Sequence, residues 1–136
     1  MTRQEFCKLL TDARDSAKVP LNDALAYAAM LSFKKIDTIE TGKTNFALSD
    51  ALLYLRMTHS TFEWNGYDMT YVDTLDEIRN CIKKERKYRE WSIVELAKHS
   101  HISSTIIYAF EDGRCDLKID TFLKLINACD ITIEID

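Results

Sequence analysis

Residues Leu96–Leu123 read LAKHSHISSTIIYAFEDGRCDLKIDTFL, and residues Leu25–Leu52 read LAYAAMLSFKKIDTIETGKTNFALSDAL. The two stretches align without a gap when Leu25 is placed on Leu96, and the alignment holds from residue 21 to residue 58. Serine, glutamate, glycine and apolar residues recur at matching positions. A match at a fixed period is typical of a duplicated unit. The sequence therefore predicts two copies of one helical unit.

Helix signals recur in both copies. A serine before the third helix and a glycine after it supply an N-cap and a left-handed C-terminal residue. Ser92 with Glu95 forms a capping-box pattern, Pro20 separates the first two helices, and Asn45 and Asp116 are placed to open the fourth helix of each copy. The predicted helices are 3–18, 21–30, 32–41 and 45–57 in the first copy, and 76–90, 92–100, 103–112 and one from 116 onward in the second.

A β-hairpin is expected between the copies. Residues 60–72 alternate around Asn65-Gly66, a strong short-range hairpin signal. The C-terminal residues 131–135 alternate in the same way and follow the first hairpin strand by one period, so we expect one small antiparallel sheet that joins the copies, pairs with a second chain, or does both. Its predicted buried face comprises Phe62, Trp64, Met69, Tyr71, Ile131, Ile133 and Ile135.

Length and composition limit the function classes. The 136 residues carry a net charge of −4 and are 46% hydrophobic and 29% charged, which is a globular composition. The chain lacks an apolar run long enough for a membrane span and a signal-peptide pattern, so a cytoplasmic protein is expected. The four cysteines are far apart, which disfavours a zinc site or a disulfide framework, and Cys7, Cys81 and Cys129 are expected to be buried thiols.

No catalytic or cofactor-binding pattern is found in the sequence. Nucleophile-elbow, phosphate-loop and metalloprotease motifs are missing. His99 and His101, two positions apart, are predicted to point to different faces and to suit metal binding poorly. We therefore expect a protein that is not an enzyme and that needs no metal or cofactor.

The second copy contains a set of motifs that the first copy keeps only in part. The motifs are Ser92-Ile-Val-Glu95-Leu96-Ala97, Ile102-Ser103, Phe110-Glu111-Asp112-Gly113-Arg114, and the apolar Ile119, Phe122, Leu123 and Ile126. In these motifs the second copy resembles the Cro/repressor-like (XRE) helix–turn–helix family. The resemblance covers residues 4–58 and 75–130, and the first copy departs in detail, with Pro20-Leu21 standing where Trp91-Ser92 stands in the second.

The family implies a mainly α fold of two tandem lambda-repressor-like four-helix units with a small β element, the hairpin 60–72 and the strand 131–135. The corresponding domains are 1–58, a connector 59–73, and 74–136. The inner core of each motif is predicted to be Leu25, Ala26, Leu31 and Ile36 in the first copy and Leu96, Ala97, Ile102 and Ile107 in the second.

The resemblance also implies functional residues, because the third helix of the family enters the DNA major groove. The base-contact candidates are Phe33, Lys34, Asp37 and Thr38 in helix 32–41 and Ser104, Thr105, Tyr108 and Ala109 in helix 103–112. The phosphate-contact candidates are Ser32, Lys35, Lys43, Ser103 and Arg114. The family pairs the helix-3 glutamate with an arginine of the first helix, which implies the pairs Arg86–Glu111 and Arg14–Glu40, with Arg14 displaced by one position from the pattern.

Two functions remain open from the sequence. The first is a sequence-specific DNA-binding transcriptional regulator that is a pseudo-dimer in one chain, with double-stranded DNA as partner and an asymmetric site, since the two recognition helices differ. The second is a protein-interaction module, antitoxin-like or a dimerisation scaffold, in which one or both copies have lost DNA binding. A toxin, or a second chain bound through the β-strands, would then be the partner. The acidic net charge favours the second function, and the serine caps with the basic first helix of the second copy favour the first.

Overall fold

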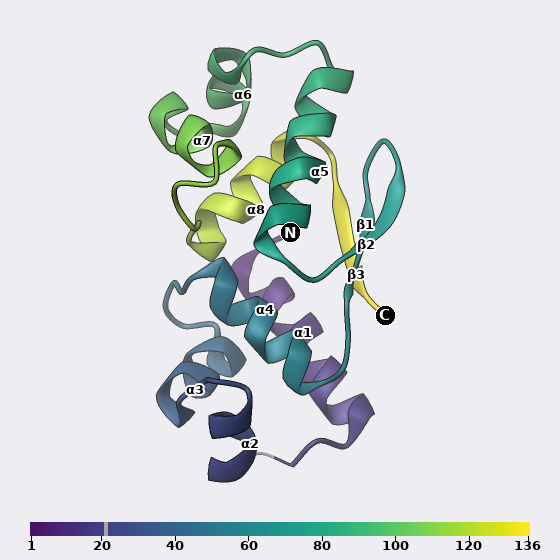
Figure 1. Cartoon of the computed structure of the whole chain (residues 1–136), viewed down its shortest axis with the longest axis vertical. Helices are drawn as coiled ribbons and strands as arrows, with labels where there is room; N and C mark the ends of the chain where they lie inside the picture. The colour runs from purple at the N-terminus through teal and green to yellow at the C-terminus, as the bar shows by residue number, and fades with distance from the viewer. Residues whose placement is uncertain (21) are drawn as a thin grey trace.

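The computed structural model describes residues 1–20 and 22–136, and the side chains of all these residues apart from 23–25. Over this part of the chain it is mainly helical, with a small antiparallel sheet (Figure 1). The elements are α1 (Arg3–Ala17), α2 (Asp23–Ala28), α3 (Phe33–Thr41), α4 (Leu48–Met57), β1 (Phe62–Asn65), β2 (Met69–Val72), α5 (Leu75–Tyr88), α6 (Ile93–Ser100), α7 (Ser104–Glu111), α8 (Ile119–Ala128) and β3 (Thr132–Ile135). Helices α1–α4 form one end of the elongated molecule and α5–α8 the other (Figure 1).

The sequence repeat is visible in the local backbone from residue 30 onward. Met30 and His101 both adopt positive φ, 62° and 59°. The following backbone N–H of Leu31 donates to Ala26 O, and that of Ile102 donates to Ala97 O. Ser32 and Ser103 then cap α3 and α7. These equivalent positions agree with the sequence alignment in which Leu25 is placed on Leu96.

The first helix of each half follows an alignment that is shifted by one position. Thr2 and Thr74 are the N-caps of α1 and α5, and Lys18 and Glu90 are the left-handed residues that follow these helices. Val19, rather than Pro20, therefore occupies the position of Trp91. The connection between the first and second helices is longer by a single residue in the first half, and α2 begins at Asp23. The predicted start of this helix, residue 21, lies outside the described residues.

This shift corrects the expected displacement of Arg14. When α1 and α5 are superposed by their caps, Arg14 falls on Arg86. The two arginines are thus direct equivalents, and the displacement that the ungapped alignment implied arises from the extra residue after α1.

The first turn of each fourth helix makes hydrogen bonds to the opposite half. The sequence predicts that Asn45 and Asp116 open the helices that follow them. This prediction is wrong, because α4 and α8 begin after Ala47 and Lys118, neither of which makes a side-chain cap. Asn45 Oδ1 instead accepts from the backbone N–H of Asp120 in α8, at 3.1 Å. Ser49 Oγ of α4 donates to Asp116 Oδ2 at 2.5 Å. Each half therefore stabilises the first turn of the other half's helix.

The sheet has the strand order β2-β1-β3, and both pairings are antiparallel. The predicted buried face is correct for Phe62, Trp64, Ile131 and Ile133, and Ile135 is half-buried. It is wrong for Met69 and Tyr71, which are 55% and 48% exposed. Asn65 pairs with Met69, so the turn comprises Gly66–Asp68 instead of Asn65-Gly66. Because side chains alternate with a period of two, this odd shift of register turns Met69 and Tyr71 to the outer face and buries Val72.

The two halves are joined at positions that are equivalent to each other. Ala47 and Lys118, which occupy the same place in the two copies, form an antiparallel bridge. On either side of it Leu48 N donates to Leu117 O and Ile119 N donates to Phe46 O, both at 2.8 Å. Glu63 and Glu134, also repeat equivalents, face each other in the β1–β3 pairing. An approximate two-fold relation therefore passes through both pairs.

One hydrophobic core serves both halves. The ring of Phe6 in α1 lies 5.6 Å from that of Phe62 in β1 and 6.3 Å from that of Phe122 in α8, and the Trp64 ring also lies 6.3 Å from Phe122. All four side chains are buried. Burial of aromatic groups of this size contributes several kcal/mol to folding, so the halves stabilise each other.

The remaining predictions about the interior are met to different degrees. Cys7 and Cys129 are buried, Cys81 is half-buried, and all cysteines in the described residues are free thiols. Of the predicted inner core, Ala26, Leu31, Ile36, Leu96 and Ile107 are buried, Ala97 and Ile102 are half-buried, and Leu25 falls among the side chains outside the description. No helix among the described residues is both long and apolar enough to cross a membrane.

Candidate nucleic-acid interface

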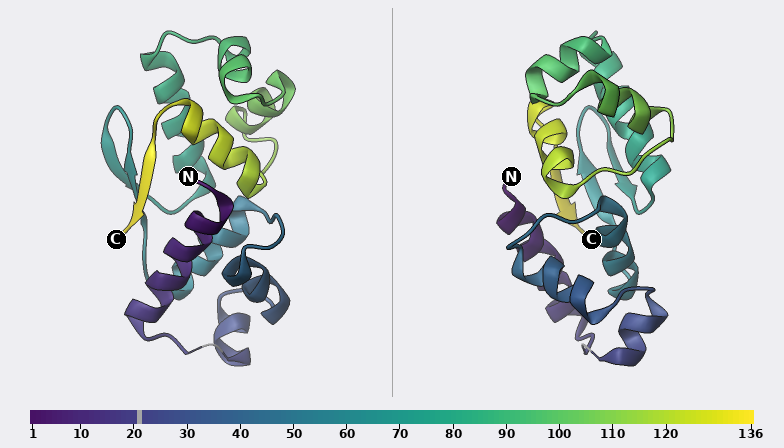
Figure 2. Two further views of the ribbon diagram at one scale, coloured as in Figure 1. Left: turned by 180° about the vertical axis from the view of Figure 1, so that it is seen from behind. Right: turned by 90° about the vertical axis from the view of Figure 1, so that its left-hand side faces the viewer.

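Helices α3 and α7 lie on the same side of the molecule, toward its two ends (Figure 1 and Figure 2, right). Each packs one face inward through two buried residues, Ile36 and Ile39 in α3 and Ile107 and Phe110 in α7. The loops that precede α4 and α8 lie between them on this side. The sheet lies on the opposite side, so α3 and α7 leave their outer faces free to contact one extended partner.

The predicted N-cap serines hold the first turn of each helix. Ser32 Oγ accepts from Lys35 N and Ser103 Oγ accepts from Thr105 N, both at 3.2 Å. Capping satisfies one of the orphan amide groups at each N-terminus, and the helix dipole makes this end attractive to an anion such as a phosphate.

The outer face of α3 is mixed in chemistry. Phe33 is 41% exposed, and Lys34 and Asp37 are exposed. Thr38 is half-buried and its hydroxyl donates to Lys34 O within the helix, so its oxygen remains available as an acceptor. Lys35 Nζ is directed toward Asp50 of α4 at 3.4 Å, whereas the exposed Lys43 belongs to no ion pair among the described residues.

The outer face of α7 is built around an aromatic ring. Tyr108 is 51% exposed, and the Arg114 guanidinium lies 5.6 Å from its ring centre. Arg114 also pairs with Asp112 at 2.6 Å, in a position where both side chains are largely exposed. Thr105 is exposed, and Ser104 and Ala109 are half-buried. The exposed face of α7 therefore presents a planar apolar ring with a cation beside it.

An arginine–glutamate pair holds each of these helices to the first helix of its half. Arg86 donates to both carboxylate oxygens of Glu111, at 2.9 and 2.7 Å, and to Trp91 O at 3.0 Å. Arg14 Nε donates to Glu40 Oε1 at 2.5 Å, and Arg14 Nη1 donates to Val19 O. The second half thus has a bidentate pair, and the first half has a single contact, as far as the described residues show.

Hydrogen bonding and burial affect the ionisation of these groups. The hydrogen bonds to Glu111 raise the pKa of Arg86 against the opposing effect of partial burial. In the first half the Tyr54 hydroxyl donates to Glu40 Oε1 at 2.8 Å, and burial, together with the Glu40 carboxylate, raises the pKa of Tyr54. Glu111 and Glu40 each accept hydrogen bonds from the groups described above. These bonds fix the angle at which α7 and α3 pack against the rest of their halves.

A basic residue between the two helices was missed in the sequence. Lys118 is exposed and forms the bridge with Ala47 in the loops that separate α3 from α7. The sequence repeat shows that Lys118 is equivalent to Ala47. Only the pairing of the two loops, however, places Lys118 between α3 and α7. Lys98, which is exposed in the last turn of α6, is a second basic residue outside the predicted set. His99 stacks on Trp91, with ring centres 4.1 Å apart, in a packing role.

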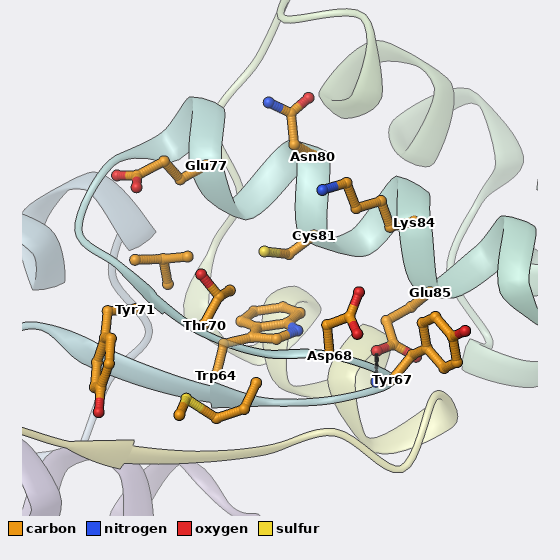
Figure 3. A pocket seen from close by; sticks show the side chains of 12 residues that line it. Trp64, Tyr67, Asp68, Thr70, Tyr71, Glu77, Asn80, Cys81, Lys84 and Glu85 are labelled. Carbon is orange, nitrogen blue, oxygen red and sulfur yellow. Dashed lines mark hydrogen bonds between the residues drawn. The ribbon is translucent and has the colours of Figure 1, made fainter.

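A pocket of about 390 Å³ lies on the other side of the molecule, between β2 and α5 (Figure 3). The Trp64 ring and the Cys81 thiol face it, and Glu85 and Lys84 line it from α5. Glu85 is only 4% exposed and accepts from the backbone N–H of Tyr67. The Tyr67 ring stacks on Tyr88 at 3.7 Å, so the pocket belongs to the contact that fastens the hairpin turn to α5.

Comparison with protein-family models, with curated proteins and with solved structures finds no match to this chain. The proposals below therefore depend on the residues and the geometry described above.

Proposed function

We propose that this chain is a sequence-specific DNA-binding transcriptional regulator of the Cro/repressor type. In this proposal α2–α3 and α6–α7 are two helix–turn–helix units, and α3 and α7 enter the major groove. The observation that carries it is the presentation of two serine-capped helices on one side of the molecule, related by the approximate two-fold through Ala47–Lys118 and Glu63–Glu134. Dimeric proteins with this motif place two such helices in successive major grooves, about 34 Å apart. Here a single chain supplies both.

Base contacts are assigned to the exposed residues near the N-terminal part of each helix. In α3, Lys34 donates to guanine, Asp37 accepts from cytosine, and Phe33 and Thr38 contact base edges or a thymine methyl group. In α7 the readers are Ser104, Thr105, Tyr108 and Ala109, which are hydroxyl or apolar groups. Because the two sets differ at each position, the DNA site is asymmetric.

Phosphate contacts provide the affinity in this proposal. Ser32 and Ser103 mark the helix N-termini that face the backbone, and Lys35, Lys43 and Arg114 add side-chain charge. Lys118 adds a central cation, where the minor groove between two half-sites would lie. The chain has a net charge of −4, but part of its negative charge lies away from α3 and α7, since Glu63, Glu134 and other carboxylates are on the sheet side.

A second candidate function is a protein-interaction module, and one observation favours it for the first half. Tyr27 and Met30, just before α3, are 88% and 79% exposed, and Phe33 is 41% exposed. Three large apolar side chains so close together are typical of a protein contact rather than of a phosphate-facing surface. In this variant the second half binds DNA and the first half binds a protein, such as a toxin.

Selection of bound duplexes from a random DNA library tests the proposal. We expect one enriched asymmetric motif, with an affinity that falls roughly a thousandfold between about 50 and 200 mM salt if some six phosphates are contacted. Enrichment of half of that motif alone would favour the second candidate. No enrichment would overturn the DNA-binding function for both halves.

A further inference from the structure

The two outer edges of the β1–β3 pair differ in whether a further strand pairs with them. β2 covers the outer edge of β1, whereas no described strand covers the outer edge of β3. Thr61 and Asp136 exchange both backbone hydrogen bonds, so in this antiparallel ladder Glu134 and Thr132 also direct their N–H and C=O groups toward β1. The backbone groups of Ile133 and Ile135 consequently point away from β1.

The repeat shows what such an edge can bind. Ile133 and Ile135 are the repeat equivalents of Phe62 and Trp64, whose outward backbone groups pair with Val72 and Thr70 of β2. The outer edge of β3 therefore has the same geometry as the edge of β1 that accepts a strand. An extended segment placed there would be the counterpart of β2.

The neighbouring helix leaves room for that segment. In the second half Glu85 and Tyr88 of α5 hold Tyr67 of the hairpin, as Figure 3 shows for Glu85. When α1 is aligned with α5 by their N-caps, the equivalents of these two residues are the small side chains Ala13 and Ser16. A groove of about 580 Å³ results between α1 and β3, which run side by side (Figure 2, left).

The groove is acidic and apolar. Its charged lining residues are Asp12, Glu134 and Asp136, and no basic side chain lines it among the residues that the structure describes. Asp12 pairs with Lys8 on the helix surface, whereas Glu134 and Asp136 form no ion pair with a described cation. Leu9, the alanines of α1 and Ile135 supply the apolar floor. A segment with apolar and basic side chains matches both properties.

We propose that the groove between α1 and β3 binds an extended segment of a partner protein, in which apolar residues alternate with or are flanked by lysine and arginine. The segment adds to β3 as an antiparallel strand, hydrogen-bonded to Ile133 and Ile135, and its apolar side chains fill the space above Ala13 and Ser16. The groove is lined by residues of α1 and β3, and β3 lies on the side of the molecule opposite α3 and α7 (Figure 1). This binding is independent of the proposed DNA contact.

A peptide titration tests this inference on the full chain. The probe is a fluorescein-labelled peptide with the β2 sequence Met-Thr-Tyr-Val between two pairs of lysines, and the matched control has glutamates in place of the lysines. We expect the lysine peptide to bind saturably and at least tenfold more tightly than the glutamate peptide. Ala13→Tyr is expected to weaken its binding at least tenfold, whereas Lys124→Tyr, on the exposed face of α8, leaves it within twofold.

Hydrogen exchange distinguishes strand addition from other binding. The amides of Ile133 and Ile135 should exchange at least tenfold more slowly in the complex, and those of Thr132 and Glu134, which already face β1, should change little. Ser16→Tyr serves as a second groove-filling variant if Ala13→Tyr lowers the thermal midpoint of unfolding.

Four results would overturn the inference. The first is no saturable binding at about 1 mM peptide, a very weak affinity. The second is equal affinity for the lysine and glutamate peptides, and the third is no slowing of exchange at Ile133 and Ile135. The fourth is a chain that doubles its mass in solution through this groove, with the doubling abolished by Ser16→Tyr, because a second copy would then be the occupant.

Discussion

Glu63 and Glu134 occupy equivalent positions in the two halves and face each other across the β1–β3 pairing. Desolvation and the facing Glu134 carboxylate, with Asp136 nearby, raise the pKa of Glu63. Like charges directly opposite in an antiparallel pair are unfavourable. The approximate two-fold relation that joins the halves thus brings together two identical charges.

The first prediction concerns the pH dependence of stability. A carboxyl group whose pKa is higher in the folded state favours folding below its unfolded pKa and loses that contribution as pH rises through the folded pKa. Glu63→Gln should therefore raise the thermal midpoint of unfolding at pH 7 and leave it unchanged near pH 3.5. Glu134→Gln should do the same, and the double variant should gain little more than either single one. Equal effects at both pH values would contradict the assignment.

Removal of one partner of the Arg86–Glu111 pair should be strongly destabilising. The side chains are 12% and 6% exposed, so Arg86→Ala leaves a buried carboxylate without its bidentate donor. A loss of about 3–5 kcal/mol in the free energy of unfolding is expected. Lys8→Ala, which breaks the exposed Lys8–Asp12 pair, is the control and should cost less than about 1 kcal/mol. Urea unfolding measures both, and similar losses for the two variants would count against a special role for Arg86.

The hairpin turn should depend on the absence of a side chain at residue 66. A Cβ on Gly66 would collide with the Glu85 carboxylate that accepts from Tyr67 N. Gly66→Ala should cost about 1–3 kcal/mol, because the buried carboxylate loses its donor. In a Glu85→Ala background the same substitution should cost much less. Additive effects in this double-mutant cycle would show that the two positions are not coupled.

The cysteines should differ in reactivity from ordinary thiols. Burial raises the pKa of Cys7 and of Cys129 to about 11, so at pH 8 very little of either is thiolate. Iodoacetamide at pH 8 should modify both only after unfolding in urea. Peptide mass spectrometry follows each site, and rapid modification of the native protein at Cys7 or Cys129 would contradict their burial.

The helices were predictable because their signals are local. Serine caps, the capping box and the glycine after α3 act within one helical turn, and the sequence repeat doubles the evidence. The register of the hairpin was not predictable in the same way. Asn65-Gly66 is a strong two-residue turn signal, but Glu85, which is distant in the sequence, holds the N–H of Tyr67 in a longer turn. The extra residue after α1 was hidden for a similar reason, because only the caps and hydrogen bonds of that helix reveal it.

The positions of the candidate interface residues on α3 and α7 were predictable, and most of these residues are exposed, but their partners were not predictable. The Arg114–Tyr108 contact and the Lys35–Asp50 pair depend on loop and α4 packing. The position of Lys118 depends on the pairing of two equivalent loops that lie far apart in the sequence.

The central claim is that α3 and α7 read DNA, and the most direct test repeats the DNA selection with the variants Lys34→Ala and Thr105→Arg. Lys83→Ala, on α5, is the control, because it removes one positive charge as Lys34→Ala does. If α3 and α7 read the two halves of one asymmetric site, Lys34→Ala relaxes the base preference in one half-site only. Thr105→Arg changes the preference in the other half-site, toward guanine, and Lys83→Ala leaves both unchanged. An enriched motif that is identical for the unmodified protein and for both recognition-helix variants would contradict the assignment of α3 and α7 as the helices that read DNA.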